Sequence, residues 1–201
     1  MNVTISNPVI AAHALGLHFS DADDRIEIEQ FISDAFYRAY GAKIRRFKPC
    51  LMSLRDPQHK LVAACGFRSA TLETLFLETY LDQPVETALS ECTGLPVKRS
   101  EIVGVGNFSV AEPGVARCLI NAIVEQLHAS SKQWAVFTAV PLVRNAFIKM
   151  KLHPVILGDA RMSRLPTEEQ AEWGSYYTHN PQIMAVQRIE QHTRSKSFHD
   201  L

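Results

Sequence analysis

Apolar residues recur along this chain with two spacings, one typical of helices and the other typical of strands. Between about residues 24 and 40 they recur every three or four positions, which predicts a helix with one buried face. Gly41 follows, at the position where a left-handed residue commonly ends a helix. The segments 47–54 and 60–68 instead read as two strands, and the turn residues at 56–59 between them predict a β-hairpin. The second strand is almost entirely apolar, which is typical of a central strand buried on both faces.

The second half of the chain twice repeats a strand followed by a helix. The apolar run 101–111 leads through a short Pro-Gly connector into a predicted helix that ends near His128. A second predicted strand over 133–140 leads into a helix that begins at Pro141 and ends near Lys151. Two such units favour an α/β or α+β layout.

The remaining segments complete a single domain of 201 residues, without a linker or an internal repeat. The first 23 residues are interpreted as an arm or first strand, and residues 191–201 as a frayed tail. The other predicted elements are a helix over 85–92, strands over 152–157 and 183–189, and a polar loop with a helical turn over 159–172. This order predicts an α/β (α+β) fold in which helices flank a mixed central sheet.

The charges of the chain balance, with 21 Lys and Arg against 21 Asp and Glu. No overall field therefore recruits nucleic acid or an anionic membrane surface. The nearest approach to a basic patch is Lys43, Arg45, Arg46 and Lys48. These four residues are interpreted as a solvated rim, with an anionic carrier or cofactor as the alternative occupant.

Cysteine and histidine spacing gives no sign of a metal site. Cys50, Cys65, Cys92 and Cys118 are far apart, and Cys65 and Cys118 lie in apolar surroundings that favour buried thiols in a reducing compartment. The eight histidines form no i, i+4 pair within a predicted helix. There is no basic leader with a cleavage site, and no apolar run approaches the ~18 residues of a membrane span. The sequence predicts a cytoplasmic protein without a transmembrane segment.

Two features hold candidate chemistry before any family is considered. Gly104 and Gly106 interrupt the strand over 101–111, and glycine within a strand marks a bulge or a close approach. The helix that follows begins with unpaired backbone N–H groups, where a phosphate can bind; the alternative is an ordinary β-α unit with a glycine kink. Arg68 ends the apolar strand, so its guanidinium needs either a carboxylate or a ligand anion.

Common catalytic motifs are absent: there is no Gly-x-Ser-x-Gly, no phosphate-loop Gly-Lys-Ser/Thr, no His-Glu-x-x-His and no complete Rossmann glycine triplet. Five blocks nevertheless resemble, in order and spacing, the bacterial thermostable hemolysin family (delta type). They are Val62-Ala-Ala-Cys-Gly-Phe-Arg68, the block 75–86 that contains Glu78, Glu101-Ile-Val-Gly-Val-Gly-Asn107, Trp134-Ala-Val-Phe-Thr138 and Trp173-Gly-Ser-Tyr-Tyr177. The resemblance covers roughly residues 25–190.

That family is in turn similar to the N-acyltransferase fold of GCN5-related acetyltransferases and acyl-homoserine-lactone synthases. In those synthases an arginine stands where Arg68 stands, and a glutamate where Glu101 stands. A second arginine soon after that glutamate, and a pair of N-terminal aspartates, have no counterpart here. The acetyltransferase phosphate loop is only echoed by residues 111–116. The resemblance therefore implies acyl transfer rather than homoserine lactone synthesis.

The resemblance implies roles for individual residues, because aminolysis of a thioester needs a base, an oxyanion donor and a clamp for the carrier phosphates. The predicted catalytic residues are Glu101 as base, with Asn107 and Thr138. The donor, acyl-CoA or acyl carrier protein, is expected at the kinked strand and the next helix start, with an asparagine from the later helix: Phe108, Ser109, Val110, Gly114, Val115, Ala116, Arg117 and Asn145. The small amine acceptor is expected near Arg68, Glu78, Trp173, Tyr176 and Tyr177.

Each assignment has a structural alternative. Glu101 could form an ion pair with Arg68 or Arg99, and Asn107 could only satisfy a bulge. Thr138 and the aromatic residues could be core packing. At the level of function, the leading hypothesis is acyl transfer to a small amine. The alternatives are a membrane-damaging hemolysin without acyl transfer and a non-catalytic module that binds an acylated carrier.

Overall fold

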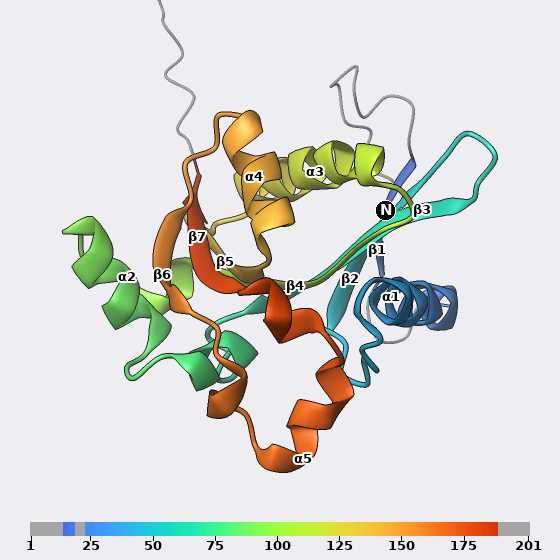
Figure 1. Ribbon diagram of the computed structural model, residues 1–201. Coiled ribbons are helices and arrows are strands. Elements are labelled where there is room, and N and C mark those ends of the chain that lie inside the picture. Colours follow the sequence, from blue (N-terminus) through green and yellow to red (C-terminus); the bar gives the residue numbers. More distant parts are fainter. Residues whose placement is uncertain (1–13, 19–22, 189–201) are drawn as a thin grey trace, which may run out of the picture.

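A seven-stranded mixed sheet forms the centre of the protein in a computed structural model that describes residues 14–18 and 23–188 (Figure 1). The strand order is β1-β2-β3-β4-β5-β7-β6, and only β4 and β5 run parallel. The strands are β1 (Ala14–His18), β2 (Cys50–Arg55), β3 (Leu61–Ser69), β4 (Ile102–Val110), β5 (Trp134–Ala139), β6 (Val155–Asp159) and β7 (Gln182–Gln187). The predicted mixed sheet flanked by helices is confirmed.

Helices cover both faces of this sheet. Helices α3 (Ala116–Ala129) and α4 (Pro141–Lys149) lie on one face, which we call the α3-face, and α1 (Arg25–Tyr40) lies on the other, the α1-face (Figure 1). Helix α2 (Val85–Thr93) packs beside β6, and the short α5 (Thr167–Gln170) lies in the loop before β7. Gly41 ends α1 with a φ of 66°, as its position predicted.

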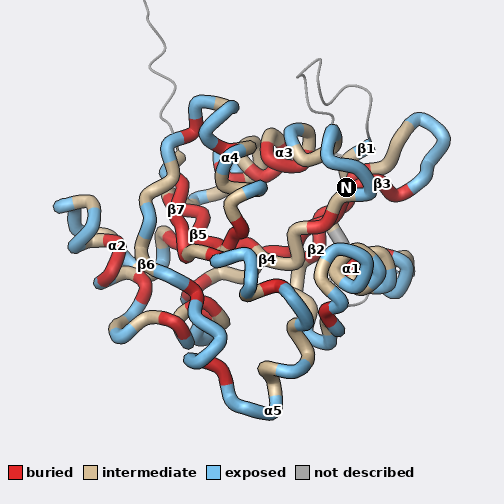
Figure 2. Tube along the Cα trace, in the orientation of Figure 1, coloured by how far each residue is buried: buried red, intermediate tan, exposed pale blue. Residues whose placement is uncertain are grey.

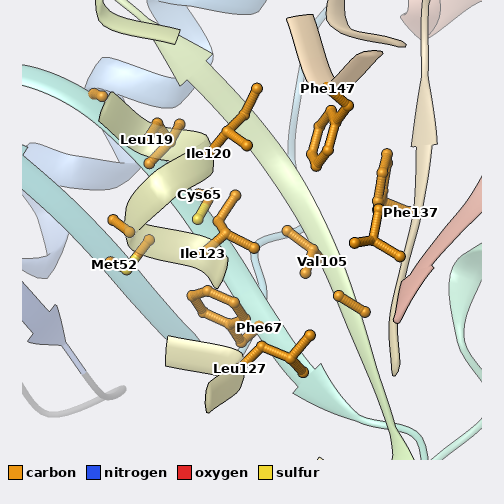
Figure 3. Close-up of a cluster of buried hydrophobic side chains, with 14 of the residues drawn as sticks. Met52, Cys65, Phe67, Val105, Leu119, Ile120, Ile123, Leu127, Phe137 and Phe147 are labelled. Carbon is orange, nitrogen blue, oxygen red and sulfur yellow. The ribbon is translucent and has the colours of Figure 1, made fainter. Parts of the chain in front are cut away.

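Three apolar clusters form the core, and they divide unequally between the two faces. One cluster covers the α3-face, where Leu119, Ile120 and Ile123 of α3 pack on Phe67 of β3 and Val105 of β4 (Figure 3). The α1-face holds two separate clusters, one under α1 and one beneath β5 and β7. The buried strands run between exposed outer helix surfaces (Figure 2), the layering expected when strands are buried on both faces.

Most predicted boundaries agree with the structure to within a few residues. The segment around Phe76–Tyr80 is a 3₁₀ helix, and β6 begins at Val155 rather than at residue 152. Most of the first 23 residues and the tail at 191–201 lie outside the described residues. None of the four cysteines forms a disulfide; Cys65 is buried as predicted, whereas Cys118 is only half-buried. Burial raises the pKa of the Cys65 thiol well above its usual value.

Candidate active site

Strands β4 and β5 separate part-way along their length. They pair at Ile102 with Trp134, at Val103 with Ala135 and at Gly104 with Val136, after which neither has the other as a partner in the described sheet. Both strands continue, β4 to Val110 and β5 to Ala139. Backbone groups on the two facing edges therefore lack a neighbouring strand and are available to a ligand.

A cavity of about 990 Å³ occupies this opening. Its lining comes from both faces of the sheet, so the cavity extends through the gap between the strands. The α3-face contributes apolar side chains, namely Ile123, Phe137, Val143 and Phe147. Phe137 and Phe147 stack with ring centroids 4.8 Å apart, at the edge of the core cluster (Figure 3). This end of the cavity suits an apolar group.

The α1-face contributes the polar end, and its central residue is Lys48. Gly66 and Gly106 are cross-strand partners, and the Lys48 side chain lies across both of them. A Cβ on Gly66 would lie 2.6 Å from Lys48 Cβ, and one on Gly106 would lie 2.9 Å from Lys48 Cε. The two glycines therefore permit a close approach by a side chain, rather than by another backbone.

The interpretation of the basic patch as a solvated rim is wrong for Lys48. Arg45 and Arg46 are exposed and pair with Glu172 and Glu169 at 3.0 and 2.8 Å, whereas Lys48 is half-buried within the cavity. Burial, followed by the charge of Arg68, lowers the pKa of the Lys48 amine to about 8, although Glu73 acts in the opposite direction. A fraction of this amine is neutral near neutral pH.

Asn107 holds the segment that contains Lys48 against β4. It has a φ of 55° at a bulge in the pairing with β3, where Ala64 faces Ser109 and Gly66 faces Gly106. Its Oδ1 accepts a hydrogen bond from the Lys48 N–H at 3.2 Å, and its Nδ2 donates to the Arg46 carbonyl at 3.3 Å. Asn107 lines the cavity. Its two hydrogen bonds are those expected of a residue that only satisfies a bulge. Its catalytic role stays a prediction.

Arg68 ends β3 one row further along the same face, opposite Gly104. Its guanidinium forms an ion pair with Glu73, so the carboxylate expected for this arginine is present. Its Nε is buried and has no hydrogen-bond partner within residues 14–18 and 23–188. Arg68 lines the cavity at the point where β4 and β5 separate, and it retains one unused donor.

Aromatic residues close the cavity on the α1-face. Trp173 and Tyr176 line it, together with Tyr40 of α1. At Gly174 this wall packs closely against the end of α1, because a Cβ on Gly174 would lie 2.1 Å from the Tyr40 carbonyl oxygen. The same oxygen accepts a hydrogen bond from the Ser175 N–H at 2.8 Å. Trp173 and Tyr176 are thus both core and cavity wall.

Tyr177 lies beside this wall but is not among the residues that line the cavity. Its hydroxyl forms a hydrogen bond with that of Tyr80. Tyr177 and Tyr80 belong to the packing beneath β5 and β7. Its predicted contact with the acceptor stays a prediction.

Glu101 lies at the other end of β4, just before the strand begins, and does not line the cavity. Its Oε2 accepts the Lys98 N–H at 2.9 Å. The alternative expectation, an ion pair with Arg68 or Arg99, is wrong, because Arg68 binds Glu73 and Arg99 binds Glu78 and Glu86. The carboxylate supports a 3₁₀ turn, and its role as a base stays a prediction.

Glu78 is also outside the cavity, and both of its carboxylate oxygens are occupied. They accept hydrogen bonds from the backbone N–H groups of Leu75 and Val85 and from two nitrogens of Arg99, at 2.6–3.0 Å. Burial opposes ionisation, but these hydrogen bonds outweigh it and lower the pKa of Glu78. Neither carboxylate oxygen is therefore left to bind the amine acceptor.

The predicted donor residues are only partly brought to the cavity. Phe108 lines it, and Thr138 on β5 does so as well. Ser109 is buried and its hydroxyl donates to the Asn107 carbonyl at 3.2 Å. The others, which lie on or near the starts of α3 and α4, are not among the lining residues: Val110, Gly114, Val115, Ala116, Arg117 and Asn145. Arg117 and Asn145 are exposed, so the placement of carrier phosphates here stays a prediction.

Sequence reasoning missed Glu73 as a cavity residue and considered Lys48 only as a member of the basic patch. A signal for Lys48 existed in the glycines, because Gly66 lies two residues before Arg68 in one strand while Gly104 and Gly106 interrupt the next. Glycines on one face of two adjacent strands indicate that something large lies over them. That the large group is Lys48 depends on the path of residues 42–49, which no local pattern determines.

Comparison with known families and structures agrees with this fold. Residues 19–192 match the family described as thermostable hemolysin. The chain belongs to the thermostable hemolysin family. No curated protein matches it.

Solved structures similar to this thermostable hemolysin family member are N-acyltransferases by their descriptions. FeeM, an N-acyl amino acid synthase from uncultured soil microbes, is 11% identical over 89% of this chain and 91% of that chain, with a TM-score of 0.61. The acyl-homoserine-lactone synthase LasI is 10% identical over 88% and 89%, with a TM-score of 0.56. A GCN5-related N-acetyltransferase from Kribbella flavida is 11% identical over 86% and 97%, with a TM-score of 0.50. At these identities the likeness shows the fold.

Two other kinds of site are absent from residues 14–18 and 23–188. In that part of the chain, no helix has the length and apolarity that crossing a membrane requires. No group of three or more His, Cys, Asp or Glu side chains is arranged there to hold a metal ion.

Proposed function

We propose that this protein transfers an acyl group from a thioester donor, acyl-CoA or acyl carrier protein, to a small amine. The observation that carries the proposal is the separation of β4 from β5 beyond Gly104, with a cavity that extends through the gap. In the reaction, the acceptor nitrogen forms an amide bond with the acyl carbon and the carbon–sulfur bond breaks. The leaving thiolate takes up a proton from the attacking nitrogen and is released as the carrier thiol, and one further proton is released when the amine binds as an ammonium ion.

The unpaired edges of β4 and β5 suit the donor. A pantetheine arm contains two amides, which can hydrogen-bond to backbone groups that lack a strand partner. The carrier phosphates would lie toward the start of α3, where backbone N–H groups and Arg117 are available. A donor of this kind places the reaction in the cytoplasm, as the sequence predicts.

The two ends of the cavity suit the other two components. The apolar end beside Phe137, Val143 and Phe147 would hold the acyl chain, and the polar end beside Lys48 and Arg68 would hold the acceptor. Asn107 and Thr138 line the cavity and would orient the reacting groups. In this proposal Glu101 supports the turn before β4.

A pair of variants tests donor binding. Val143 lines the cavity, whereas its neighbour Leu142 is 73% exposed. Thermal unfolding is measured with and without coenzyme A and long-chain acyl-CoA; a ligand at ~100 times its Kd adds ~2.7 kcal/mol to the unfolding free energy. We expect Val143→Trp to abolish the acyl-CoA shift and Leu142→Trp to retain it. Absence of any shift in the native protein, with carrier-protein thioesters included, contradicts the proposal.

The same cavity would serve a non-catalytic module that binds an acylated carrier, so turnover must be measured separately. Release of free thiol that depends on an added amine, with formation of the amide seen by mass spectrometry, supports an enzyme. Binding without release supports the module. Lysis of red cells by purified protein without any acyl donor supports a direct hemolysin instead.

A further inference from the structure

The polar end of the cavity contains a cation without a carboxylate partner. Three arginines in the lining each have one, in the pairs Arg45–Glu172, Arg46–Glu169 and Arg68–Glu73. Within the described part of the chain, the Lys48 amine has neither an ion pair nor a hydrogen bond to another side chain. Since a half-buried charge without a partner is unfavourable, the site is incomplete as the protein alone presents it.

Lys48 and the unused donor of Arg68 lie in neighbouring rows of the same face. Lys48 crosses the row formed by Gly66 and Gly106, and Arg68 projects from the next row, opposite Gly104. Two strand residues span about 7 Å, a distance that one small anion held between two long side chains can bridge. The Arg68 Nε is buried and unpartnered, so it also lacks an acceptor.

The electrostatics of this end favour an anion. Among the residues that the structure describes, Glu73 is the carboxylate that acts on Lys48, and it is already paired with Arg68. Burial and the charge of Arg68 together disfavour the protonated amine, which is why the pKa of Lys48 falls. An anion between the two cations would offset both effects.

We propose that Lys48 and Arg68 bind a carboxylate of the acyl acceptor, so that the acceptor is an amino carboxylate such as an α-amino acid. This rests on the proposed acyl transfer. A carboxylate suits the site because the Lys48 amine and the Arg68 Nε can each donate to one of its two oxygens. With its carboxylate at this row, the acceptor directs its amine toward the opening between β4 and β5, where the thioester is expected.

The test compares acceptors that differ only in the carboxylate, such as tyrosine with tyramine and leucine with isopentylamine. The kcat/KM for each is measured with the native protein, Lys48→Met and, as a control, Lys60→Met, which alters an exposed lysine outside the cavity. We expect Lys48→Met to lower kcat/KM for the amino acids by about 10–100-fold, because hydrogen bonds between charged groups are the strong ones. The change for the amines should stay within about threefold, so the native preference for amino acids is lost.

Binding of the products gives a readout that does not need turnover. By calorimetry, an N-acyl amino acid should bind the native protein more tightly than the N-acyl amine without the carboxylate, and Lys48→Met should remove the difference. Lys48→Arg should restore part of it, because the charge returns.

The outcomes separate this proposal from the broader one. If neither acceptor class is acylated but the N-acyl amino acid binds in a Lys48-dependent manner, acyl transfer fails and the carboxylate site stands. If both classes are acylated equally and Lys48→Met changes neither, the carboxylate site is wrong and acyl transfer stands. If Lys48→Met weakens coenzyme A binding without altering acceptor choice, the cations serve the carrier phosphates and the proposal is wrong.

Discussion

The two faces of the sheet differ in what they contain. The α3-face is one continuous apolar cluster, in which α3 lies directly on β3 and β4 (Figure 3). The α1-face has two apolar clusters, with the polar end of the cavity between them. The continuous cluster of the α3-face stabilises the fold. On the α1-face, Lys48 and Arg68 lie where apolar packing would otherwise continue. For residues of the α3-face that do not line the cavity, we therefore expect substitutions to affect stability more than ligand binding, and for Lys48 and Arg68 we expect the reverse.

The largest expected effect is on the α3-face. Ile120 is fully buried and does not line the cavity, so Ile120→Ala removes packing without altering the site. We expect a loss of about 3 kcal/mol in the free energy of unfolding, the usual range for such truncations, measured by urea denaturation. Acyl-CoA binding by the remaining folded protein should be unchanged. A loss of binding with little loss of stability would contradict the difference described between the two faces.

The second expected effect is at the aromatic wall of the α1-face. Gly174 has a φ of 50° and leaves no room for a Cβ, so Gly174→Ala should lower the unfolding free energy by about 2 kcal/mol. The control is Gly114→Ala, because a Cβ at Gly114 meets nothing within 4 Å. Equal urea midpoints for the two variants would show that the wall is not fastened to α1 in this way.

The third prediction concerns Lys48, whose removal should raise stability. The pKa of Lys48 is about 8 in the folded protein and about 10.4 in an unfolded chain. Between these values the unfolded chain binds one more proton than the folded protein, so stability rises with pH through this window. Below pH 8 the folded protein bears the full cost of burying the protonated Lys48 amine. Lys48→Met removes this cost and should raise the free energy of unfolding by about 1–2 kcal/mol at pH 7, a value discounted for the partial exposure of the side chain.

The measurement is thermal unfolding at pH 7 and pH 9.5, with Lys60→Met as the control. The gain from Lys48→Met should shrink at the higher pH, where the native lysine is largely neutral in the folded protein. A variant that is less stable than the native protein at pH 7 would contradict the description of Lys48 as an unpartnered cation.

The smallest expected effect is at Asn107. Asn107→Gly tolerates the positive φ but loses the two hydrogen bonds to residues 46 and 48, and should cost about 1 kcal/mol. Asn107→Ala loses the same bonds and adds strain, so it should cost roughly 1 kcal/mol more. Urea denaturation of both variants separates the free-energy cost of the positive φ from the cost of losing the hydrogen bonds. Equal stability of the two would show that the positive φ is not required.

The elements of the fold could be predicted because they depend on local patterns. The helical spacing before Gly41, the apolar run that became β3 and the two β-α units each predicted the element that forms. Phe108, Thr138, Trp173 and Tyr176 were also predicted, and the structure brings them to the cavity. Each lies on or next to a strand or loop whose position in the sheet follows from that order of elements.

The centre of the site could not be predicted, because it depends on contacts between distant segments. The sequence marked Glu101 and Glu78 as chemical groups, but their carboxylates support turns outside the cavity. It placed Lys48 with exposed arginines, although the segment containing Lys48 is drawn onto β4 by Asn107, 59 residues later. By itself the sequence determined which strands and helices form. Only the tertiary structure decided where β4 leaves β5 and which charges remain without a partner, because both depend on long-range packing and burial rather than on local periodicity.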